Sequence, residues 1–514
     1  MKKIFALFLA IFALLPYLVA CGVKKPVDTD DTDTKTDTAT VTDTVTDTTT
    51  DTGGGDDSGD VVKIHSKDTV LKDWEGKTLN VLATKWNTDN PSPPWSVIEL
   101  CVTERDDNSG YGSRINNSIL DRAKYIQDTY GVKINWIQTS RDGVSNAIST
   151  AIKDDKAGEK YHIAMPRVIH AQDIVQSNLL YDMASSKYID FSQSYFSQAA
   201  HEAYTVAGRT FYAAGDSSFL DEWTTNLIFF NKTMAENRGL DLYGMVKEGK
   251  WTIDELVGIA KAIGADDGDN EWTDNDTYGF AFTLPSMLIT SSGIQQVRVD
   301  PDTGLYKLSL NDDKIGIVID KIIQIQKAPW AHSSWDSYYS PFVAMKEGRL
   351  LFLQEVVQHI DDLNDVENIE VGVLPLPKLS EKQEDYATTC WQQAVLLCIP
   401  RTTDDREFSE YFIDVLSWTG QEYVMKKLYE KLNAALPDDD GVSFGILKDY
   451  IFDKIVYDNG MFYGFGGLFK DLHQSWSSGQ NKFTEVYNDA SLTAKSIVDG
   501  KKTGWNVTWK NYKD

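Results

Sequence analysis

Short apolar segments alternate with amphipathic helical segments along the first part of this 514-residue chain. The pattern predicts strands at residues 77–84, 132–138 and 161–166, with helices at 115–131 and 144–155 between them. In each helical segment the apolar residues return every three or four positions. Connections that run from strand through helix to strand build a mainly parallel sheet with helices on both faces. The sequence therefore predicts an α/β fold.

The same two kinds of segment continue further along the chain. Thr252 and Glu255 form a capping box, the polar pair that typically begins a helix, and an amphipathic segment follows them. Two more helices are predicted at 315–327 and 406–432. Strands are predicted at 210–216, 226–232, 349–355, 369–378 and 393–400.

The N-terminus has the order of a secretion signal. Two lysines precede an apolar run at residues 4–20, which is too short for a comfortable membrane span. The sequence LVAC at 18–21 resembles the bacterial lipobox, in which cleavage leaves the cysteine as the first residue with lipid on its thiol. The resemblance implies a signal peptide at 1–20 and lipidation at Cys21. It also implies a lipid-anchored position in the cell membrane, on the extracytoplasmic face of a Gram-positive-like surface. An ordinary signal peptide with a chance cysteine is the alternative.

A strongly acidic stretch at residues 28–60 follows the cysteine. It carries eleven Asp against the single Lys35 and has almost no residue that could enter a core. Such a segment cannot offset the entropy of ordering, and its charges repel one another and extend the chain. We expect residues 21–62 to be a lipidated cysteine and a disordered tether.

The charge and the cysteines of the chain exclude several classes of protein. The net charge of −27 at pH 7 argues against nucleic acid as a partner. Beyond Cys21, the cysteines are Cys101, Cys390 and Cys398, an odd number that allows at most one disulfide within the chain. This is therefore no disulfide scaffold.

Six segments, in a fixed order, resemble the extracellular solute-binding proteins of ABC importers, a large group that includes sugar binders. Each motif is short and weak alone, but their order is that of the family. The resemblance covers about residues 77–436. The segments are Leu227–Leu240, Trp251–Ile263, Tyr278–Phe282, Ala344–Leu353, Val371–Lys378 and 394–422.

The resemblance implies a periplasmic-binding-protein-like fold of two lobes in the body at 63–514. Each lobe would be a mainly parallel sheet flanked by helices, and a hinge would join the two. The first lobe would comprise about residues 70–215 and 385–435, and the second about 228–372. Residues 436–514 match no motif of the family, and we expect them to be a C-terminal helical elaboration.

The function implied is capture of a mono- or oligosaccharide and its delivery to the transmembrane subunits of an ABC permease. Such a protein is expected to be a monomer that performs no chemistry and needs no cofactor. Two alternatives from other classes remain. One is a surface glycan-binding adhesin, and the other is a surface glycoside hydrolase, whose pair of carboxylates could be supplied by any of many acids.

We expect the ligand-binding residues to lie on the loops between the two lobes. A sugar site needs aromatic faces against C–H groups and planar polar side chains on the hydroxyls. For each tryptophan, packing in a core is the alternative, and for Arg167, Asp216 and Glu355 it is a structural ion pair. The candidates are Trp86, Arg167, Asp216, Glu222, Trp223, Trp335, Glu355, Trp391 and Gln392.

No motif of a hydrolase, a zinc protease or a phosphate-binding loop occurs in the sequence. The acidic segment 265–276 is similar to an EF-hand calcium loop, but it has Ala265 at the first position and Asn270 where the loop needs glycine. We expect a solvated acidic turn there and no metal site.

Overall fold

The computed structural model describes most of the chain from residue 62 onward, all of it in the unit Asp60–Asp514. The predictions for the signal peptide, Cys21 and the acidic tether fall outside the described residues. The described residues are 62–84, 101–102, 104–105, 111–140, 142–154, 160–310, 313–332, 340–363, 369–436, 441–463 and 478–513.

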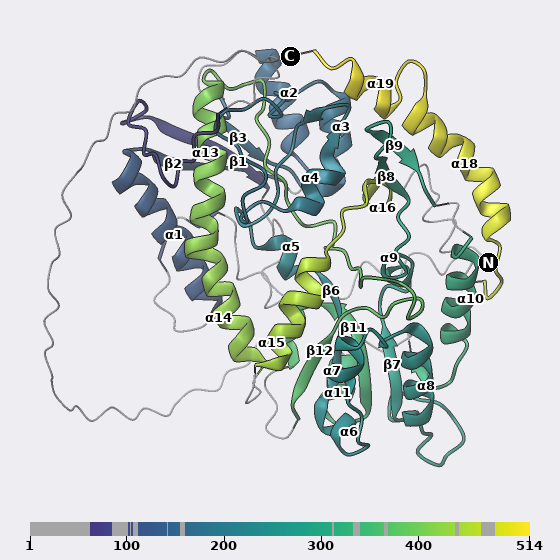
Figure 1. Cartoon of the computed structure of the whole chain (residues 1–514). Helices are drawn as coiled ribbons and strands as arrows, with labels where there is room; N and C mark the ends of the chain where they lie inside the picture. The colour runs from purple at the N-terminus through teal and green to yellow at the C-terminus, as the bar shows by residue number, and fades with distance from the viewer. Residues whose placement is uncertain are drawn as a thin grey trace, which may run out of the picture. The chain divides into compact units, whose positions relative to one another are not determined.

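The first sheet has the strand order β2–β1–β3 and is parallel throughout. Gly131 follows the first helix with a φ of 71°, a left-handed conformation that glycine adopts freely and that commonly ends helices. The strand–helix alternation predicted from the sequence is confirmed in this part of the chain (Figure 1). The elements are β1 (Thr78–Thr84), α1 (Tyr111–Tyr130), β2 (Lys133–Thr139), α2 (Val144–Asp154), β3 (Ile163–Met165) and α3 (Ala171–Gln176).

The second sheet has the order β10–β7–β11–β6–β12. β6 pairs antiparallel with both of its neighbours, while the other pairs are parallel, so four strands share one direction and β6 is reversed. The strands are β6 (Asn226–Asn231), β7 (Tyr278–Phe282), β10 (Ala331–His332), β11 (Leu350–Val356) and β12 (Val371–Leu374). The helices along this part of the chain are α6 (Lys232–Glu236), α7 (Leu242–Lys247), α8 (Ile253–Ile263), α9 (Met287–Ser291), α10 (Ile315–Gln326), α11 (Ser340–Lys346) and α12 (Ile360–Leu363).

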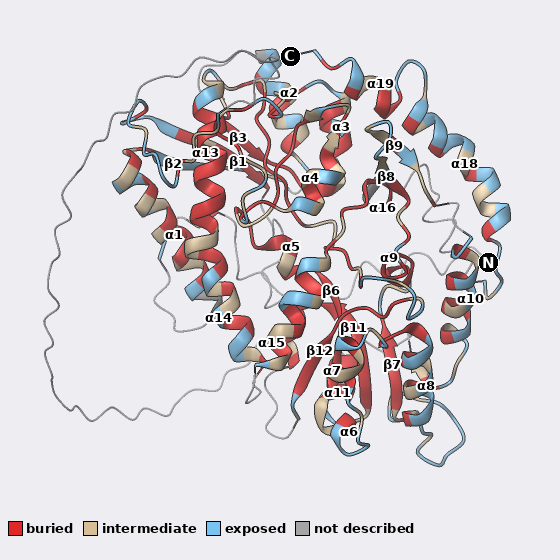
Figure 2. Ribbon diagram, viewed as in Figure 1, coloured by how far each residue is buried: buried red, intermediate tan, exposed pale blue. Residues whose placement is uncertain are grey.

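The central strands of this sheet are buried along their whole length. Every residue of β6 and β11 is buried, which is the pattern of strands covered on both faces (Figure 2). Trp251, at the start of α8, packs with its ring 5.4 Å from that of Phe352 and donates its indole N–H to the carbonyl of Pro375 at 2.8 Å. Thr252 accepts the backbone N–H of Glu255, so the predicted helix cap is confirmed.

Two of the predicted strands are extended segments held mainly by isolated bridges, apart from Thr210, which belongs to a two-residue strand at Arg209–Thr210. The segment 393–400 runs antiparallel to β3, through bridges from Cys398 to Ala164 and from Val395 to Arg167. The segment 210–216 joins it through the bridge from Ala213 to Leu397. Two antiparallel segments therefore extend the parallel first sheet, which the strand–helix alternation of the sequence did not predict.

A long helical segment connects this region to the C-terminal part of the chain. It consists of α13 (Arg406–Thr419), a π-helical turn (Gly420–Met425) and α14 (Lys426–Ala435). Helices continue after it, as α15 (Val442–Ile446), α16 (Asn459–Tyr463), α18 (Phe483–Asp499) and α19 (Trp505–Lys510). The remaining short elements are α4 (Gln198–Tyr204), β4 (Thr205–Val206), β5 (Arg209–Thr210), α5 (Leu220–Trp223), β8 (Val297–Asp300) and β9 (Leu305–Leu308).

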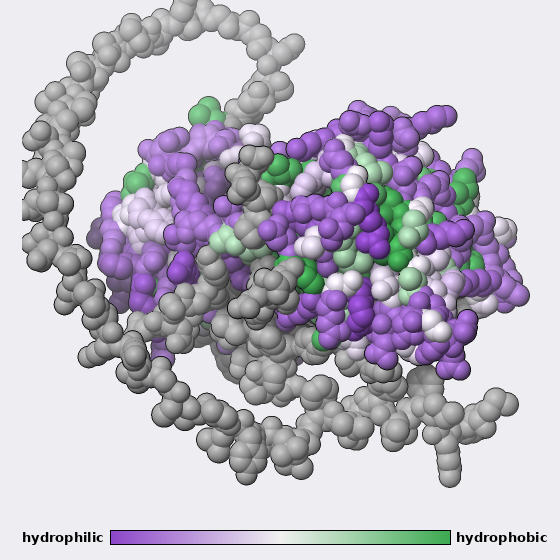
Figure 3. Space-filling model, turned by 90° about the horizontal axis from the view of Figure 1, so that it is seen from below, coloured by the Kyte–Doolittle hydropathy of each residue, from purple (hydrophilic) through white to green (hydrophobic). Residues whose placement is uncertain are grey.

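Hydrophilic side chains cover most of the coloured surface in the view of Figure 3, and apolar residues appear there in smaller groups. Among the described residues, no helix has both the length and the apolar character that are needed to cross a membrane.

Candidate functional site

Backbone hydrogen bonds bring the described candidate residues onto neighbouring segments. Next to Arg167, the N–H of Val168 donates to Ala394 and the N–H of Leu396 donates to Pro166, both at 2.9 Å. The loop that follows β3 is thereby held against the segment that carries Trp391 and Gln392 a few residues earlier.

The same segment is bonded on its other side to the start of β6. The N–H of Trp391 donates to the carbonyl of Thr224 at 2.9 Å, and the N–H of Val357 donates to Thr225 at 3.0 Å. Glu355 of β11 lies opposite Leu227 of β6. We call the four segments 166–168, 390–396, 222–227 and 355–357 the junction segments. Together they form one belt between β3 of the first sheet and β6 of the second.

Arg167 is buried and its guanidinium faces Asp142, with 2.5 Å between Nη1 and Oδ1. His170 Nε2 lies 2.9 Å from the same oxygen. The hydrogen bond from His170, together with the charge of Arg167, lowers the pKa of the Asp142 carboxyl. Arg167 therefore forms an ion pair just after β3. A structural ion pair was the alternative to ligand binding that the sequence left open for this residue.

Glu355 is also buried, and its partner is on the next turn of the chain. Its Oε2 lies 3.7 Å from His359 Nε2, and His359 Nδ1 lies 2.7 Å from Asp362. Burial raises the pKa of the Glu355 carboxyl. This acid is therefore part of a buried carboxylate–imidazole–carboxylate chain.

The tryptophan candidates differ in their surroundings. Trp223 is 1% exposed, and Lys431 Nζ lies 5.3 Å from the centre of its ring, so it packs as a core residue. Trp391 and Gln392 are half-buried, and within the described part of the chain neither side chain has a hydrogen-bond partner. Trp86 and Trp335 lie outside the described residues.

Asp216 and Glu222 line a cavity of about 690 Å³ together with Asp221. Aromatic side chains line the same cavity: Tyr195, Phe196, Tyr429, Phe452 and Tyr457. We call this cavity the acidic cleft. Carboxyl groups beside aromatic rings are the combination that was sought for a sugar site.

The π-helical turn positions one wall of the acidic cleft. A side chain at Gly420 would overlap the backbone of Asp216, so glycine permits the close approach of the helix. The next residue, Gln421, then donates from Nε2 to Asp216 Oδ2 at 2.7 Å. Single π turns within α-helices are frequent at functional sites.

Burial dominates the electrostatics of the three acids. It raises the pKa of Asp216 to about 7. It also raises the pKa of Asp221, although Tyr457 donates its hydroxyl to this carboxyl at 2.9 Å. Burial and the neighbouring charge of Asp221 raise the pKa of Glu222 well above its ordinary value. Burial therefore favours the protonated form of all three carboxyl groups.

Sequence reasoning missed Asp221 and Tyr457. Asp221 directly precedes Glu222, and the pair of adjacent acids was the available signal. Tyr457 lies in the C-terminal part of the chain, 236 residues from its partner, where no motif was recognised.

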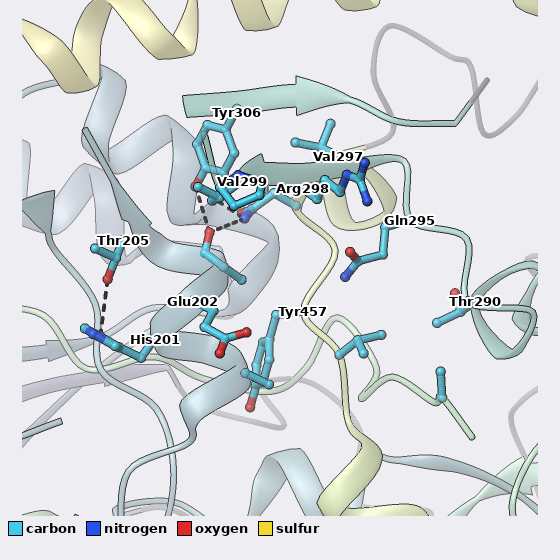
Figure 4. A pocket seen from close by; sticks show the side chains of 17 residues that line it. His201, Glu202, Thr205, Thr290, Gln295, Val297, Arg298, Val299, Tyr306 and Tyr457 are labelled. Carbon is cyan, nitrogen blue, oxygen red and sulfur yellow. Dashed lines mark hydrogen bonds between the residues drawn. The ribbon is translucent and has the colours of Figure 1, made fainter. Parts of the chain in front are cut away.

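A second cavity, of about 650 Å³, lies between α4, the β8–β9 hairpin and residues 456–459 (Figure 4). Thr205 Oγ1 and His201 Nδ1 are 3.2 Å apart on one side of it, and Asn459 donates to the carbonyl of Ala203. Its charged side chains, Glu202 and Arg298, are exposed. Glu202 is the one carboxylate among the described residues that line this cavity, which is therefore less acidic than the acidic cleft.

The acidic turn at 265–276 brings oxygen atoms of Asp266, Asp267 and Asp269 within 4.8 Å of one another at the surface. Asp276 is buried and accepts the backbone N–H groups of Asp267 and Thr273. Asp276 therefore stabilises the turn from within, through these two hydrogen bonds.

Three solved structures resemble the chain over most of its length. A cyclo/maltodextrin-binding protein complexed with maltotetraose gives a TM-score of 0.55 at 15% identity, over 83% of this chain and 98% of that chain. A cyclic α-maltosyl-1,6-maltose binding protein from Arthrobacter globiformis gives 0.54 at 12% identity, over 84% and 99%. An ABC substrate-binding protein from Listeria monocytogenes in complex with cycloalternan gives 0.51 at 11% identity, over 82% and 99%. The chain has the fold of these binding proteins.

No protein-family model and no curated protein matches the sequence. The solute-binding-protein fold inferred from the six short motifs is nevertheless confirmed, because the structural likeness extends over more than four fifths of the chain. The three neighbours are binding proteins rather than enzymes.

Proposed function

We propose that this chain is a lipid-anchored solute-binding protein that captures a mono- or oligosaccharide and delivers it to an ABC permease. The observation that carries the proposal is the convergence of the candidate loops on the junction segments. There the half-buried Trp391 and Gln392 lie next to the start of β6. The solute-binding-protein fold also supports the proposed binding function. Its two sheets would belong to two lobes, with the junction segments as the hinge.

Binding of carbohydrate is tested on the purified body by thermal shift and calorimetry. Malto-oligosaccharides and cyclic glucans should raise the unfolding temperature more than amino acids, peptides or polyols, because a ligand that binds only the folded state stabilises it by mass action. Shifts with peptides alone would contradict the carbohydrate assignment. Hydrolysis of the sugar during the measurement would favour the glycoside hydrolase alternative.

Anchoring is tested separately, through Cys21. Replacing Cys21 with Ala should remove the protein from the membrane fraction or leave it unprocessed, because the diacylglyceryl group on the cysteine thiol would supply the attachment. Cell fractionation and metabolic labelling with a fatty acid measure the effect. A variant that stays in the membrane and still takes up label would overturn the lipid anchor.

A further inference from the structure

The three carboxyl groups of the acidic cleft have no cationic partner among the described residues. Asp221 is only 5% exposed, and apart from the hydrogen bond that its carboxyl shares with that of Glu222, its Oδ1 and Glu222 Oε2 have no partner there. Two of the lysines nearby are engaged elsewhere, since Lys426 pairs with Glu422 and Lys431 pairs with Asp361. A third, Lys448, also lines the cleft, but it is exposed and forms no ion pair with the three acids. The cleft thus holds three carboxyl groups that form no ion pair within the described part of the chain.

Burying ionised carboxylates is costly unless a positive charge compensates them. One proton shared between the adjacent carboxyls of Asp221 and Glu222 relieves only that pair. Asp216 is then still held by no more than the amide of Gln421. A ligand that brings its own positive charge and N–H donors would satisfy all three.

The shape of the cleft argues for an organic cation. Among the described residues, three potential metal ligands come within 4.8 Å of one another only in the surface turn around Asp267, so the three acids of the cleft do not form such a cluster. The cavity of about 690 Å³ also exceeds what a single ion needs, and the aromatic side chains of Tyr429 and Tyr457 line it. Aromatic faces attract cations in addition to excluding water.

We propose that the acidic cleft binds a protonated primary amine carried by a small organic molecule. Two sources share this chemistry, an amino sugar and an aliphatic diamine. The proposal does not rest on the carbohydrate function, because the cleft would recognise the ammonium group in either molecule.

Calorimetry on the purified body tests the proposal with two matched pairs of probes. These are glucosamine against N-acetylglucosamine, and 1,4-diaminobutane against 1,4-butanediol, each pair differing in the charged amine. At least one amine should bind about tenfold or more tightly than its neutral partner, as a charge-assisted hydrogen bond to a buried acid implies. Glucosamine alone would identify the amino sugar as the source, and the diamine alone would identify the aliphatic amine.

The variants Asp221→Asn and Glu222→Gln should each weaken binding of that amine about tenfold or more. The matched control is Glu430→Gln on α14, an exposed acid that pairs with Lys427 and should leave affinity unchanged. If Asp221→Asn or Glu222→Gln fails to fold, Asp216→Asn takes its place and should likewise weaken binding of the amine. Equal binding of charged and neutral probes, or amine affinity unchanged in the folded cleft variants, would overturn the proposal.

Discussion

Trp223 and Trp391 lie on junction segments that are hydrogen-bonded to each other, but only one of them is fully buried. Replacing Trp391 with Ala should weaken carbohydrate binding by about 1–3 kcal/mol and largely preserve folding, because a half-buried ring can stack on a sugar. Replacing Trp223 with Ala should instead destabilise the fold by about 3–5 kcal/mol, the cost of a large cavity in a core. Calorimetry and urea unfolding separate the two effects. Loss of stability in both variants, with residual affinity intact, would make both residues structural.

Asp216 should make the free energy of unfolding depend on pH. Burial raises the pKa of its carboxyl to about 7, from an ordinary value of 3.8. The folded state therefore binds more protons than the unfolded state between about pH 4 and pH 7, and the free energy of unfolding falls as pH rises through that window. Asp216→Asn should remove this contribution, which is at most about 1.4 kcal/mol per pH unit.

Urea unfolding of both proteins across that pH window measures the difference. Asp458, whose pKa burial raises to about 6, adds a slope of the same sign elsewhere and is common to both proteins. The other charged and titratable groups that line the cleft are Asp221, Glu222, Glu422, Lys426, Lys448, Asp453, Tyr195, Tyr429 and Tyr457. An identical pH profile in the variant would mean that Asp216 titrates as an ordinary surface acid.

Among the elements, those with a local signal were predictable. The cap at Thr252 and the amphipathic pattern after it specify α8, and the wholly apolar run at 227–230 specifies β6. The reversal of β6 and the antiparallel bridges of residues 394–400 depend on partners far away in the sequence. No local pattern encodes such pairings, because strand direction is decided by tertiary packing.

Two glycines near the contact between α8 and β7 provide a prediction about how these elements pack. A side chain at Gly279 would overlap the backbone of Ala260, whereas Gly258 of α8 has open space around it. Gly279→Ala should therefore destabilise the fold by about 3 kcal/mol, since backbone atoms cannot move aside cheaply. Gly258→Ala should stabilise it by up to about 1 kcal/mol, the difference in helix propensity. Denaturant midpoints compare the two, and a neutral Gly279→Ala would show that the helix and strand are loosely packed.

For the whole molecule, the convergence of the candidate loops could be predicted only in outline. The resemblance to solute-binding proteins placed the candidates around Glu222 and Trp391 on loops expected between the lobes, and the structure joins these two segments through the hydrogen bond from Trp391 to Thr224. The pairing of Asp221 with Tyr457 could not be anticipated, because it depends on a C-terminal part of the chain that carries no recognised motif. The acidic cleft is thus formed by residues that only the tertiary structure brings together.

Closure of two lobes around the ligand is the motion that the proposed function requires. If the junction segments act as the hinge, a sugar that touches both lobes binds the compact state better and shifts the population toward it. Small-angle scattering should then show a smaller radius of gyration with bound ligand. Unfolding should become harder by about 2.7 kcal/mol when the free ligand is a hundredfold above its Kd. The Trp391→Ala variant should reach the same radius of gyration when enough ligand is added to saturate it. The substitution weakens affinity but does not alter the hinge. One radius with and without a confirmed ligand would show a rigid receptor, and the clamp mechanism would be wrong even though binding is real.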